Sequence, residues 1–153
     1  MQKLIIQKIK HRYINNNKGQ SLVEFAILLP VLLIMLLGLM EWGFLLWTQT
    51  TFVNAAREGA RDAVVIRDWD TNNAARSTEV RNLVVSRLQG LPASLTKDIS
   101  GRITIQFLPS ASHIDSIRIS IVAQPYKPVM GFAGVMVPKS LSASAEFRYE
   151  GNL

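Results

Sequence analysis

The chain has 153 residues, a formal net charge of +6 and no cysteine. This length allows one domain with appendages, and the missing cysteine excludes disulfide bonds, thiol catalysis and cysteine-based metal sites. The positive charge is local, because residues 1–19 hold five basic residues and no acid, whereas residues 20–153 hold twelve basic and eleven acidic residues. Since nucleic-acid binding needs a basic face on a folded domain, we expect no nucleic-acid partner.

The basic segment 1–19 ends at a junction, Lys18–Phe25, where the sequence KGQSLVEF leads into a long apolar run. An ordinary secretory signal is cut after its apolar core. A cut between Gly19 and Gln20 would instead keep the core and create a new amino group. An α-amino group has a pKa of about 8 and is mostly protonated at neutral pH, so it could pair with the carboxylate of Glu24. The alternative is that Glu24 simply lies at the cytoplasmic interface of a membrane.

The apolar run predicts a transmembrane helix over residues 20–47. Phe25–Met40 contains no charge, and the apolar character resumes after Glu41. A helix over 25–47 would be about 35 Å long, enough to cross a bilayer core of roughly 30 Å. Because the basic residues precede the run, the positive-inside rule places the N-terminus in the cytoplasm and exports residues 48–153.

Several residues in this run are candidates for packing or interface roles. Pro30 removes a backbone donor, so it is expected to kink or loosen the helix. Gly38 and Gly43 are small residues of the kind that lets helices pack closely in a membrane. Three side chains near the far end of the run are predicted to be membrane-interface anchors: Glu41, Trp42 and Trp47.

The helix is expected to continue over residues 48–66, which contain no proline. One face carries mostly small residues at helical spacing: Phe52, Ala56, Gly59, Ala60 and Ala63. We expect Gly59 to mark a close approach, and Glu58 to form a favourable pair with Arg61. Two interpretations of the motif Arg57–Arg61 stay open. It is either a docking surface for a partner helix or a solvated face whose small side packs on its own domain.

The rest of the chain predicts a second helix and a small sheet. Residues 67–73 read as a loop that is polar apart from Trp69, and apolar periodicity then predicts a helix at about 74–89. The period changes to two in three later segments, which predict strands at about 102–108, 115–123 and 140–149. The expected fold class is α+β: a long N-terminal transmembrane helix that continues into an extracytoplasmic module of a second helix and an antiparallel sheet of about three strands.

A set of motifs runs from Gly19 to about Val65, in the order Gly19, Glu24-Phe25-Ala26, Leu29-Pro30, Gly38, Glu41, Gly43 and Ala55-Ala56-Arg57-Glu58-Gly59-Ala60-Arg61. This set closely resembles the TadE-like family of minor pseudopilins of tight-adherence (Flp-type) pilus systems. The resemblance implies cleavage by a dedicated prepilin peptidase between Gly19 and Gln20, on the cytoplasmic side. Glu24 would then hold the fifth position of the mature chain, with Phe25 as the aromatic residue after it.

The resemblance also implies a function and a location. The chain would be a non-catalytic, membrane-anchored subunit that acts in assembly or initiation of a Flp-type pilus. It would reside in the bacterial cytoplasmic (inner) membrane as a single-pass protein, or enter the pilus itself. The implied partners are the prepilin peptidase, the major pilin and other minor pseudopilins, the inner-membrane pilus assembly platform and the lipid bilayer.

Other interpretations of the sequence compete with this one. An unprocessed single-pass anchor could present an extracytoplasmic binding module, and an ordinary signal peptidase could cut between Ala55 and Ala56. The pattern from Ser94 to Lys97 matches the nucleophile motif of some acyl-enzymes but lacks the partner motifs, so we expect no catalytic residues. The spacing of the two histidines predicts no metal site, and no cofactor is expected. The apolar stretch 129–137 fits either a loop on the core or an exposed assembly patch.

Overall fold

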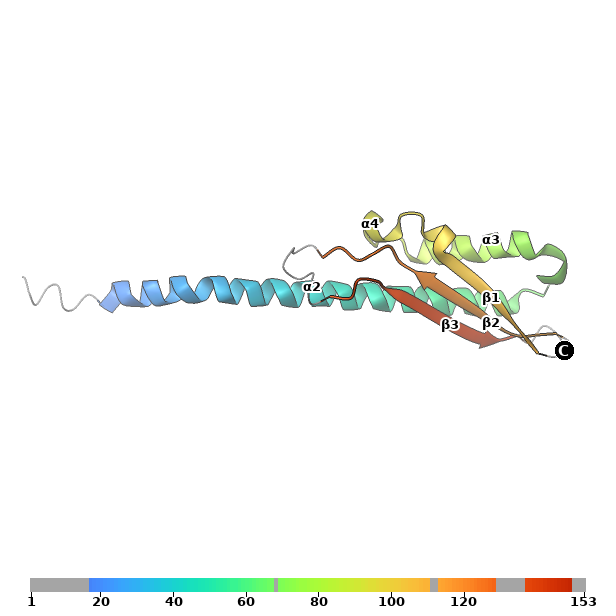
Figure 1. Ribbon diagram of the computed structural model, residues 1–153, viewed down its shortest axis with the longest axis horizontal. Coiled ribbons are helices and arrows are strands. Elements are labelled where there is room, and N and C mark those ends of the chain that lie inside the picture. The colour runs from blue at the N-terminus through green and yellow to red at the C-terminus, as the bar shows by residue number, and fades with distance from the viewer. Residues whose placement is uncertain (1–16, 68, 111–112, 129–136, 150–153) are drawn as a thin grey trace, which may run out of the picture. The chain divides into compact units, whose positions relative to one another are not determined.

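The computed structural model describes residues 17–67, 69–110, 113–128 and 137–149. The chain divides into two compact units, Met1–Met40 and Glu41–Leu153. The elements follow the order that Figure 1 labels: α2 (Asn17–Val65), α3 (Trp69–Arg87), α4 (Ala93–Thr96), the 3₁₀ turn η1 (Ile99–Arg102), β1 (Ile103–Ser110), β2 (His113–Val122) and β3 (Ser142–Arg148). This is the α+β class expected from the sequence.

Helix α2 is 49 residues long and belongs to both units. It continues past Trp47, as predicted, and ends at Val65. Hydroxyl groups in its middle part donate to the carbonyl one turn earlier: Thr48 to Phe44, Thr50 to Leu46 and Thr51 to Trp47, at 2.8, 2.8 and 2.9 Å. The hydroxyl groups of these side chains therefore find their hydrogen-bond acceptors within the helix itself.

The predicted loop over residues 67–73 is wrong, because α3 already begins at Trp69. The indole of Trp69 is 2% exposed, and its Nε1–H donates to the carbonyl oxygen of Ala63 at 2.9 Å. The backbone leaves helical geometry only at Asn72, with φ −129° and ψ 31°. A buried anchor at the first residue thus allows the helix to start within a polar sequence that has little helical periodicity of its own.

The predicted second helix is otherwise confirmed, with its end at Arg87. Val80 and Val84 of α3 are buried, as is Leu88 directly after the helix, so one stripe at every fourth residue enters the core. Gly90 follows with φ +103°, a left-handed conformation that suits glycine after a helix. The short elements α4 and η1 were not expected from the sequence; they insert Leu95 and Ile99 into the core.

The three predicted strands form one antiparallel sheet in the order β1-β2-β3. Ile105 pairs with Ile119 on one side of β2, and Ala145 pairs with Ile119 on the other. A register shift between Leu108 and Pro109 interrupts the β1–β2 ladder near its end. The strand boundaries differ from the predicted ones by a few residues at most, and the pairing of apolar positions in register keeps one apolar face.

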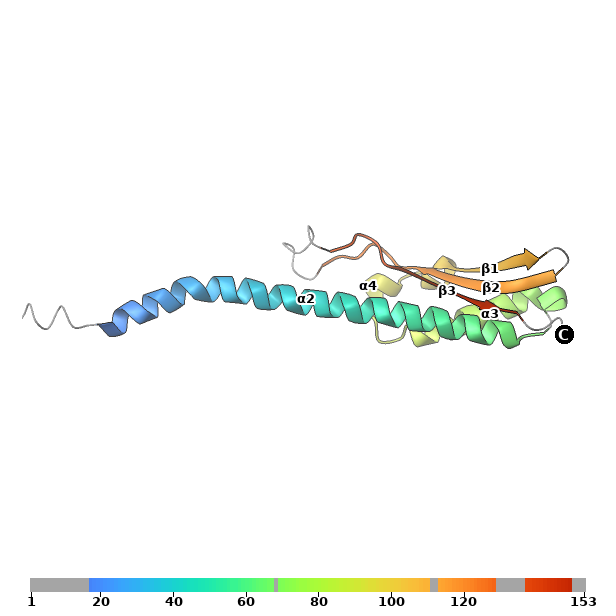
Figure 2. The ribbon, with the colours of Figure 1, turned by 90° about the horizontal axis from the view of Figure 1, so that it is seen from below.

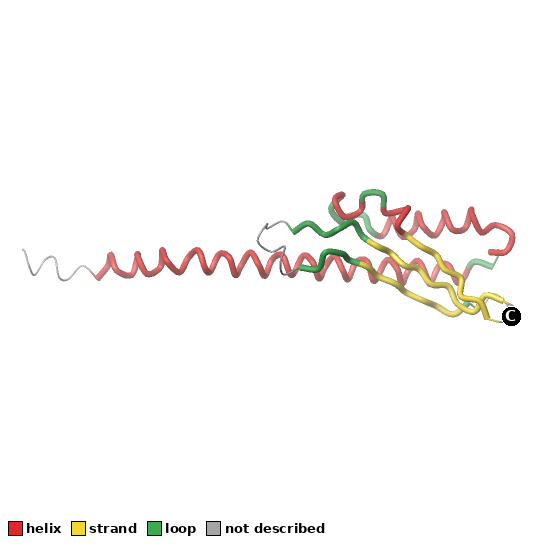
Figure 3. Tube along the Cα trace, in the orientation of Figure 1, coloured by secondary structure: helices red, strands yellow, loops and turns green. Residues whose placement is uncertain are grey.

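In the unit Glu41–Leu153, the sheet forms one layer and the helices form the other. Figures 1 and 3 show the strands running obliquely across α2, and Figure 2 shows all three strands on one side of the pair α2 and α3. Ile117, Ile119 and Ile121 have no exposed area and face this helix pair. The core therefore lies between the odd positions of β2 and the small-residue face of α2.

Candidate functional site

The candidate processing junction lies in the first turns of α2. Gln20 Nε2 donates to Glu24 Oε1 at 3.0 Å, an exposed contact between residues four apart on one helix. Both residues are exposed, as are Gly19 and Phe25. In the uncut chain, the side chain of Gln20 therefore already holds the carboxylate that a new amino group at Gln20 could bind.

The apolar part of α2 in the unit Met1–Met40 is exposed along its length. The large apolar side chains involved are Leu22, Val23, Phe25, Ile27, Leu28, Leu29, Val31, Leu32, Leu33, Ile34, Met35, Leu36, Leu39 and Met40. A continuous apolar surface of this size is far larger than a water-soluble monomer tolerates and marks contact with lipid or another chain. Of the helices that the structure describes, α2 is the one that is both long enough and apolar enough to cross a membrane.

Pro30, Gly38 and Gly43 lie in the part of α2 where most side chains are exposed. The helix continues through Pro30, and Figure 2 shows a gentle bend in the blue, N-terminal part of α2. A Cβ atom added at Gly38 or Gly43 would meet nothing within 4 Å. Their predicted role in packing against other helices therefore concerns other chains and stays a prediction.

Glu41 is buried rather than open to solvent. It is 4% exposed, and Tyr126 in the segment after β2 donates its hydroxyl to Glu41 Oε1 at 2.5 Å. Burial, followed by this hydrogen bond and the charge of Glu41, raises the pKa of Tyr126 well above its usual value. The ring of Tyr126 also lies 6.5 Å from that of Phe44, with the planes tilted by 35°. A carboxylate assigned from sequence to the membrane interface is thus also an internal contact of the unit Glu41–Leu153.

The two tryptophans predicted to be membrane-interface anchors are partly exposed. Trp42 is 44% exposed and Trp47 is 49% exposed. Phe44 packs beside Trp47 with ring centroids 5.7 Å apart. On the same stretch of α2, Leu45 and Thr48 are buried by the module, so only one side of the helix is free there. The role of the tryptophans as membrane-interface anchors stays a prediction.

The motif Arg57–Arg61 packs on the domain through its small residue. A Cβ on Gly59 would overlap Cγ2 of Val84 and would stand 3.2 Å from Cδ1 of Ile119. Gly59 is therefore the close approach of α2 to both α3 and the sheet, as expected. The predicted pair of Glu58 with Arg61 is wrong: Glu58 Oε1 instead lies 2.5 Å from Arg87 Nη2 of α3. Glu58 points to the α3 side of the helix, and both Glu58 and Arg61 help to line a groove that also includes Phe147 of β3.

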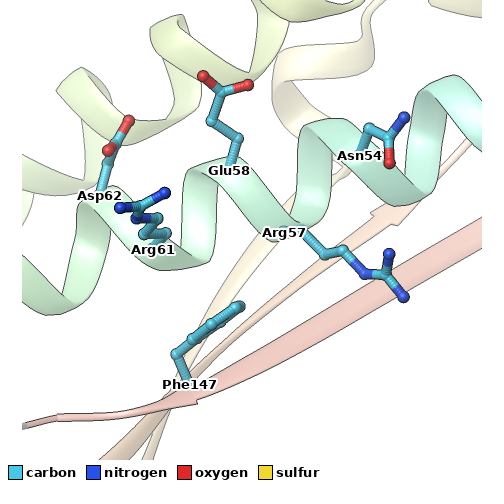
Figure 4. A pocket seen from close by; sticks show the side chains of 6 residues that line it. All are labelled: Asn54, Arg57, Glu58, Arg61, Asp62 and Phe147. Carbon is cyan, nitrogen blue, oxygen red and sulfur yellow. The ribbon is translucent and has the colours of Figure 1, made fainter.

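That groove is open, has a volume of about 530 Å³, and is lined by Asn54, Arg57, Glu58, Arg61, Asp62 and Phe147. Figure 4 shows Arg57 extending from α2 on the side of β3, whereas Glu58 points the opposite way. Among the described residues, no carboxylate forms an ion pair with Arg57 or Arg61. The interpretation of the small side as an internal contact is thus supported, while the two arginines remain available to a partner.

Sequence reasoning missed three functional features. Tyr126 was passed over because a tyrosine between two prolines gives no periodic signal. The cluster on the outer face of the sheet was missed because its members are distant in sequence: Ser116 Oγ donates to Glu146 Oε1 at 2.6 Å, and Arg118 Nη2 donates to Oε2 at 2.7 Å. These bonds, that of Ser116 first, hold the pKa of Glu146 below its usual value. Phe147 pairs with the buried Ile117 yet is 39% exposed, and it lines the groove.

The remaining candidates do not assemble into a reactive site. Ser94 and Lys97 are both exposed, and no hydrogen bond joins their side chains in the part of the chain that is described. The same residues contain no group of three side chains suited to hold a metal ion. The leader up to Asn16 and the stretch 129–136 lie outside the described residues. The expectations that the chain has no catalytic residue, cofactor or metal stay predictions.

The described elements thus define a protein with one apolar helix of membrane-spanning length and an α+β module built around the same helix. A family model described as TadE-like protein matches residues 19–61, which confirms the resemblance found in the sequence. The match contains the candidate processing junction, the apolar part of α2 and the motif Arg57–Arg61. It supports involvement in a tight-adherence pilus. No match was found among curated proteins or among solved structures.

Proposed function

We propose that this chain is a minor pseudopilin, a non-catalytic membrane-anchored subunit that acts in assembly or initiation of a Flp-type pilus after prepilin peptidase cleavage between Gly19 and Gln20. The observation that carries the proposal is the junction itself. Gly19 precedes Glu24 by five residues within the matched TadE-like segment, and the bare apolar part of α2 follows at once. Its partners would be the peptidase, the major pilin, other minor pseudopilins and the inner-membrane assembly platform.

The proposed mechanism uses the charge at the start of α2. The basic leader holds the N-terminus in the cytoplasm, and the apolar segment stays in the inner membrane with the α+β module outside. Cleavage frees an amino group at Gln20, which is mostly protonated at neutral pH. When apolar helices pack side by side, this cation and the carboxylate of Glu24, on the same or a neighbouring chain, leave water together. A buried unpaired charge would destabilise the assembly by several kcal/mol, so pairing sets the axial register of the helices.

The geometry of the uncut chain fits this mechanism. The side-chain amide of Gln20 donates to Glu24 Oε1 at 3.0 Å, so the two residues lie on the same face of the helix, which supports the proposed pairing. Both groups are exposed, so the peptidase and a neighbouring helix have access to them. The small residues Gly38 and Gly43, which nothing in the described chain covers, offer sites for close packing by that neighbour.

The decisive experiment identifies the mature N-terminus. The full chain is expressed with a prepilin peptidase, extracted from membranes and analysed by mass spectrometry, with a Gly19→Leu variant as the matched control. We expect a product that begins at Gln20 for the natural chain and no cleavage for the variant. A product that begins at Ala56 would indicate an ordinary signal peptidase, and an intact chain would favour the unprocessed anchor.

A second experiment separates processing from assembly. Glu24→Gln removes the charge of the carboxylate and keeps an acceptor oxygen for Gln20. We expect this variant to be cleaved normally but to lose pilus assembly, measured as sheared filaments and as co-purification with the other pilus subunits. Normal assembly of the cleaved variant would show that charge pairing at Glu24 does not set the register.

A further inference from the structure

Strand β3 forms one edge of the three-stranded sheet. The ladder to β2 begins with Ala123 N donating to Leu141 O at 2.9 Å and ends with Tyr149 N donating to Asp115 O at 2.8 Å. The register between these ends is regular. Because backbone groups alternate sides along a strand, odd positions point to β2 and even positions point outward. The outward groups belong to Ser142, Ser144, Glu146 and Arg148.

Among the residues that the structure describes, only the first of these outward positions is capped by a side chain. Gln49 Nε2 of α2 donates to the carbonyl oxygen of Ser142 at 2.9 Å. Within the described chain, nothing pairs with the outward backbone groups of Ser144, Glu146 and Arg148. These three residues are exposed. An unpaired stretch of strand of this kind is a template for another strand.

The opposite edge strand, β1, is less regular near its end than β3 is. Strand β1 carries Pro109, which has no N–H to offer, and its register shifts between Leu108 and Pro109. Proline and irregular register are devices that keep edge strands from pairing with other chains. The sequence of β3, SASAEFR, contains no proline, lysine or bulge. The ladder of β1 is thus irregular near its end, whereas the ladder of β3 is regular along its length.

The open edge lies beside the groove that Arg57, Arg61 and Phe147 help to line. The charge of Glu58 is already engaged by Arg87. The remaining ionic side chains of the groove are two arginines and Asp62, which leaves one net positive charge. A strand paired with β3 would place the residues opposite Ala145 and Phe147 on the same face as those side chains, toward α2. Acidic side chains at these positions would meet the two guanidinium groups.

We propose that the open edge of β3 and the adjoining groove bind an extended acidic segment of a partner protein by strand addition. Main-chain hydrogen bonds to Ser144, Glu146 and Arg148 would supply affinity, and carboxylates on the face toward α2 would supply selectivity through Arg57 and Arg61. On the outer face, Glu146 would disfavour a second carboxylate directly opposite it. The proposal rests on the unit Glu41–Leu153 and is independent of cleavage at Gly19.

The test uses the full chain in detergent micelles and two fluorescent peptides. One peptide alternates valine and threonine with glutamate at two positions of one face, and its matched control carries lysine at those positions. Fluorescence anisotropy should show the acidic peptide binding at least about tenfold more tightly than the basic one. Added salt should narrow this difference, because exposed charges are screened. Equal affinity of the two peptides would overturn the proposal.

Two sets of variants test the two parts of the site. Combined Arg57→Glu and Arg61→Glu should weaken binding of the acidic peptide about tenfold or more. The control is Lys97→Glu, which reverses a positive charge directly after α4 and should leave the affinity unchanged. Ser144→Pro removes an outward N–H and leaves the β2 ladder intact, so it should weaken both peptides. Ser144→Thr keeps the N–H and should bind as the natural chain does. Circular dichroism verifies that each variant is folded.

Hydrogen exchange supplies an independent readout. Bound acidic peptide should slow exchange of the amide protons of Ser144, Glu146 and Arg148. Unchanged exchange at these amides would show that the peptide does not pair with β3. If the chain alone forms dimers that Ser144→Pro dissociates and the peptide cannot displace, the edge pairs with a second copy, and the assignment to an acidic partner is wrong.

Discussion

The hydroxyl of Tyr126 donates a 2.5 Å hydrogen bond to Glu41 across a sequence separation of 85 residues. Both side chains are buried, at 6% and 4% exposure. The bond fixes the segment after β2 to α2 at the first residue of the unit Glu41–Leu153. A buried carboxylate without a hydrogen-bond donor would destabilise the fold, and Tyr126 supplies that donor to Glu41 from the same unit.

Replacing Tyr126 with phenylalanine should lower the free energy of unfolding by about 1–3 kcal/mol, because a buried hydrogen bond to a carboxylate is lost. The comparison variant is Tyr149→Phe, since Tyr149 donates at 3.0 Å to the neutral carbonyl of Ile66. That loss should be smaller, about 0.5–1.5 kcal/mol. Denaturant unfolding of the full chain in micelles measures both. A Tyr126 variant no less stable than the Tyr149 variant would show that the bond to Glu41 adds little.

Alanine at position 59 should destabilise the module by about 1–3 kcal/mol, because its Cβ would overlap the side chain of Val84. The matched control is Gly43→Ala on the same helix, where nothing lies within 4 Å, and no loss is expected there. Val84→Ala should make room for the new methyl group, so the double variant should be more stable than the sum of the single losses predicts. Strict additivity in thermal unfolding would count against a direct clash.

Replacing Trp69 with phenylalanine should lower the free energy of unfolding by about 1–3 kcal/mol. The change removes the bond to the carbonyl of Ala63 and part of an edge-to-face contact with Phe107, whose centroid lies 5.0 Å away. Trp47→Phe is the control, because Trp47 is half exposed, and its cost should stay within about 0.5 kcal/mol. Tryptophan fluorescence during denaturant unfolding reports both variants. Equal losses would mean that Trp69 does not anchor the start of α3.

The pKa of Glu146 should rise toward its ordinary value of 4.5 when its donors are removed. We expect the pKa to rise in both Ser116→Ala and Arg118→Ala, because the hydroxyl bond of Ser116 and then the hydrogen bond and charge of Arg118 lower it in the natural chain. Carboxyl titration by NMR measures these values. Since the folded pKa is lowered, the stability from this contact is complete above about pH 4.5 and is lost as the pH falls through the folded value. Coincident titration curves of natural chain and Ser116→Ala would refute this assignment.

The candidate processing site could be read from the sequence because its information is local. The order of basic leader, Gly19, Glu24 and an uncharged apolar run is a linear pattern, and membrane insertion responds to composition along the chain. The strands were equally accessible, since alternation of apolar residues directly reflects one buried face. The contacts of the charged side chains were not accessible. Glu58 has Arg61 nearby on its own helix yet pairs with Arg87, because the packing of α3 on Gly59 brings that guanidinium closer.

The sequence by itself determined the long apolar helix, the α+β class and the small-residue face of α2, and it supplied the candidate junction. All of these depend on composition and periodicity along the chain. Only the tertiary structure decided that Trp69 begins a helix and that Tyr126 donates a hydrogen bond to Glu41. It also decided that, among the described residues, the edge of β3 is unpaired beside Arg57 and Arg61. These features join residues far apart in sequence, so no local pattern encodes them. Their geometry arises when burial of the isoleucines of β2 against Gly59 and Val84 fixes the sheet on the helices.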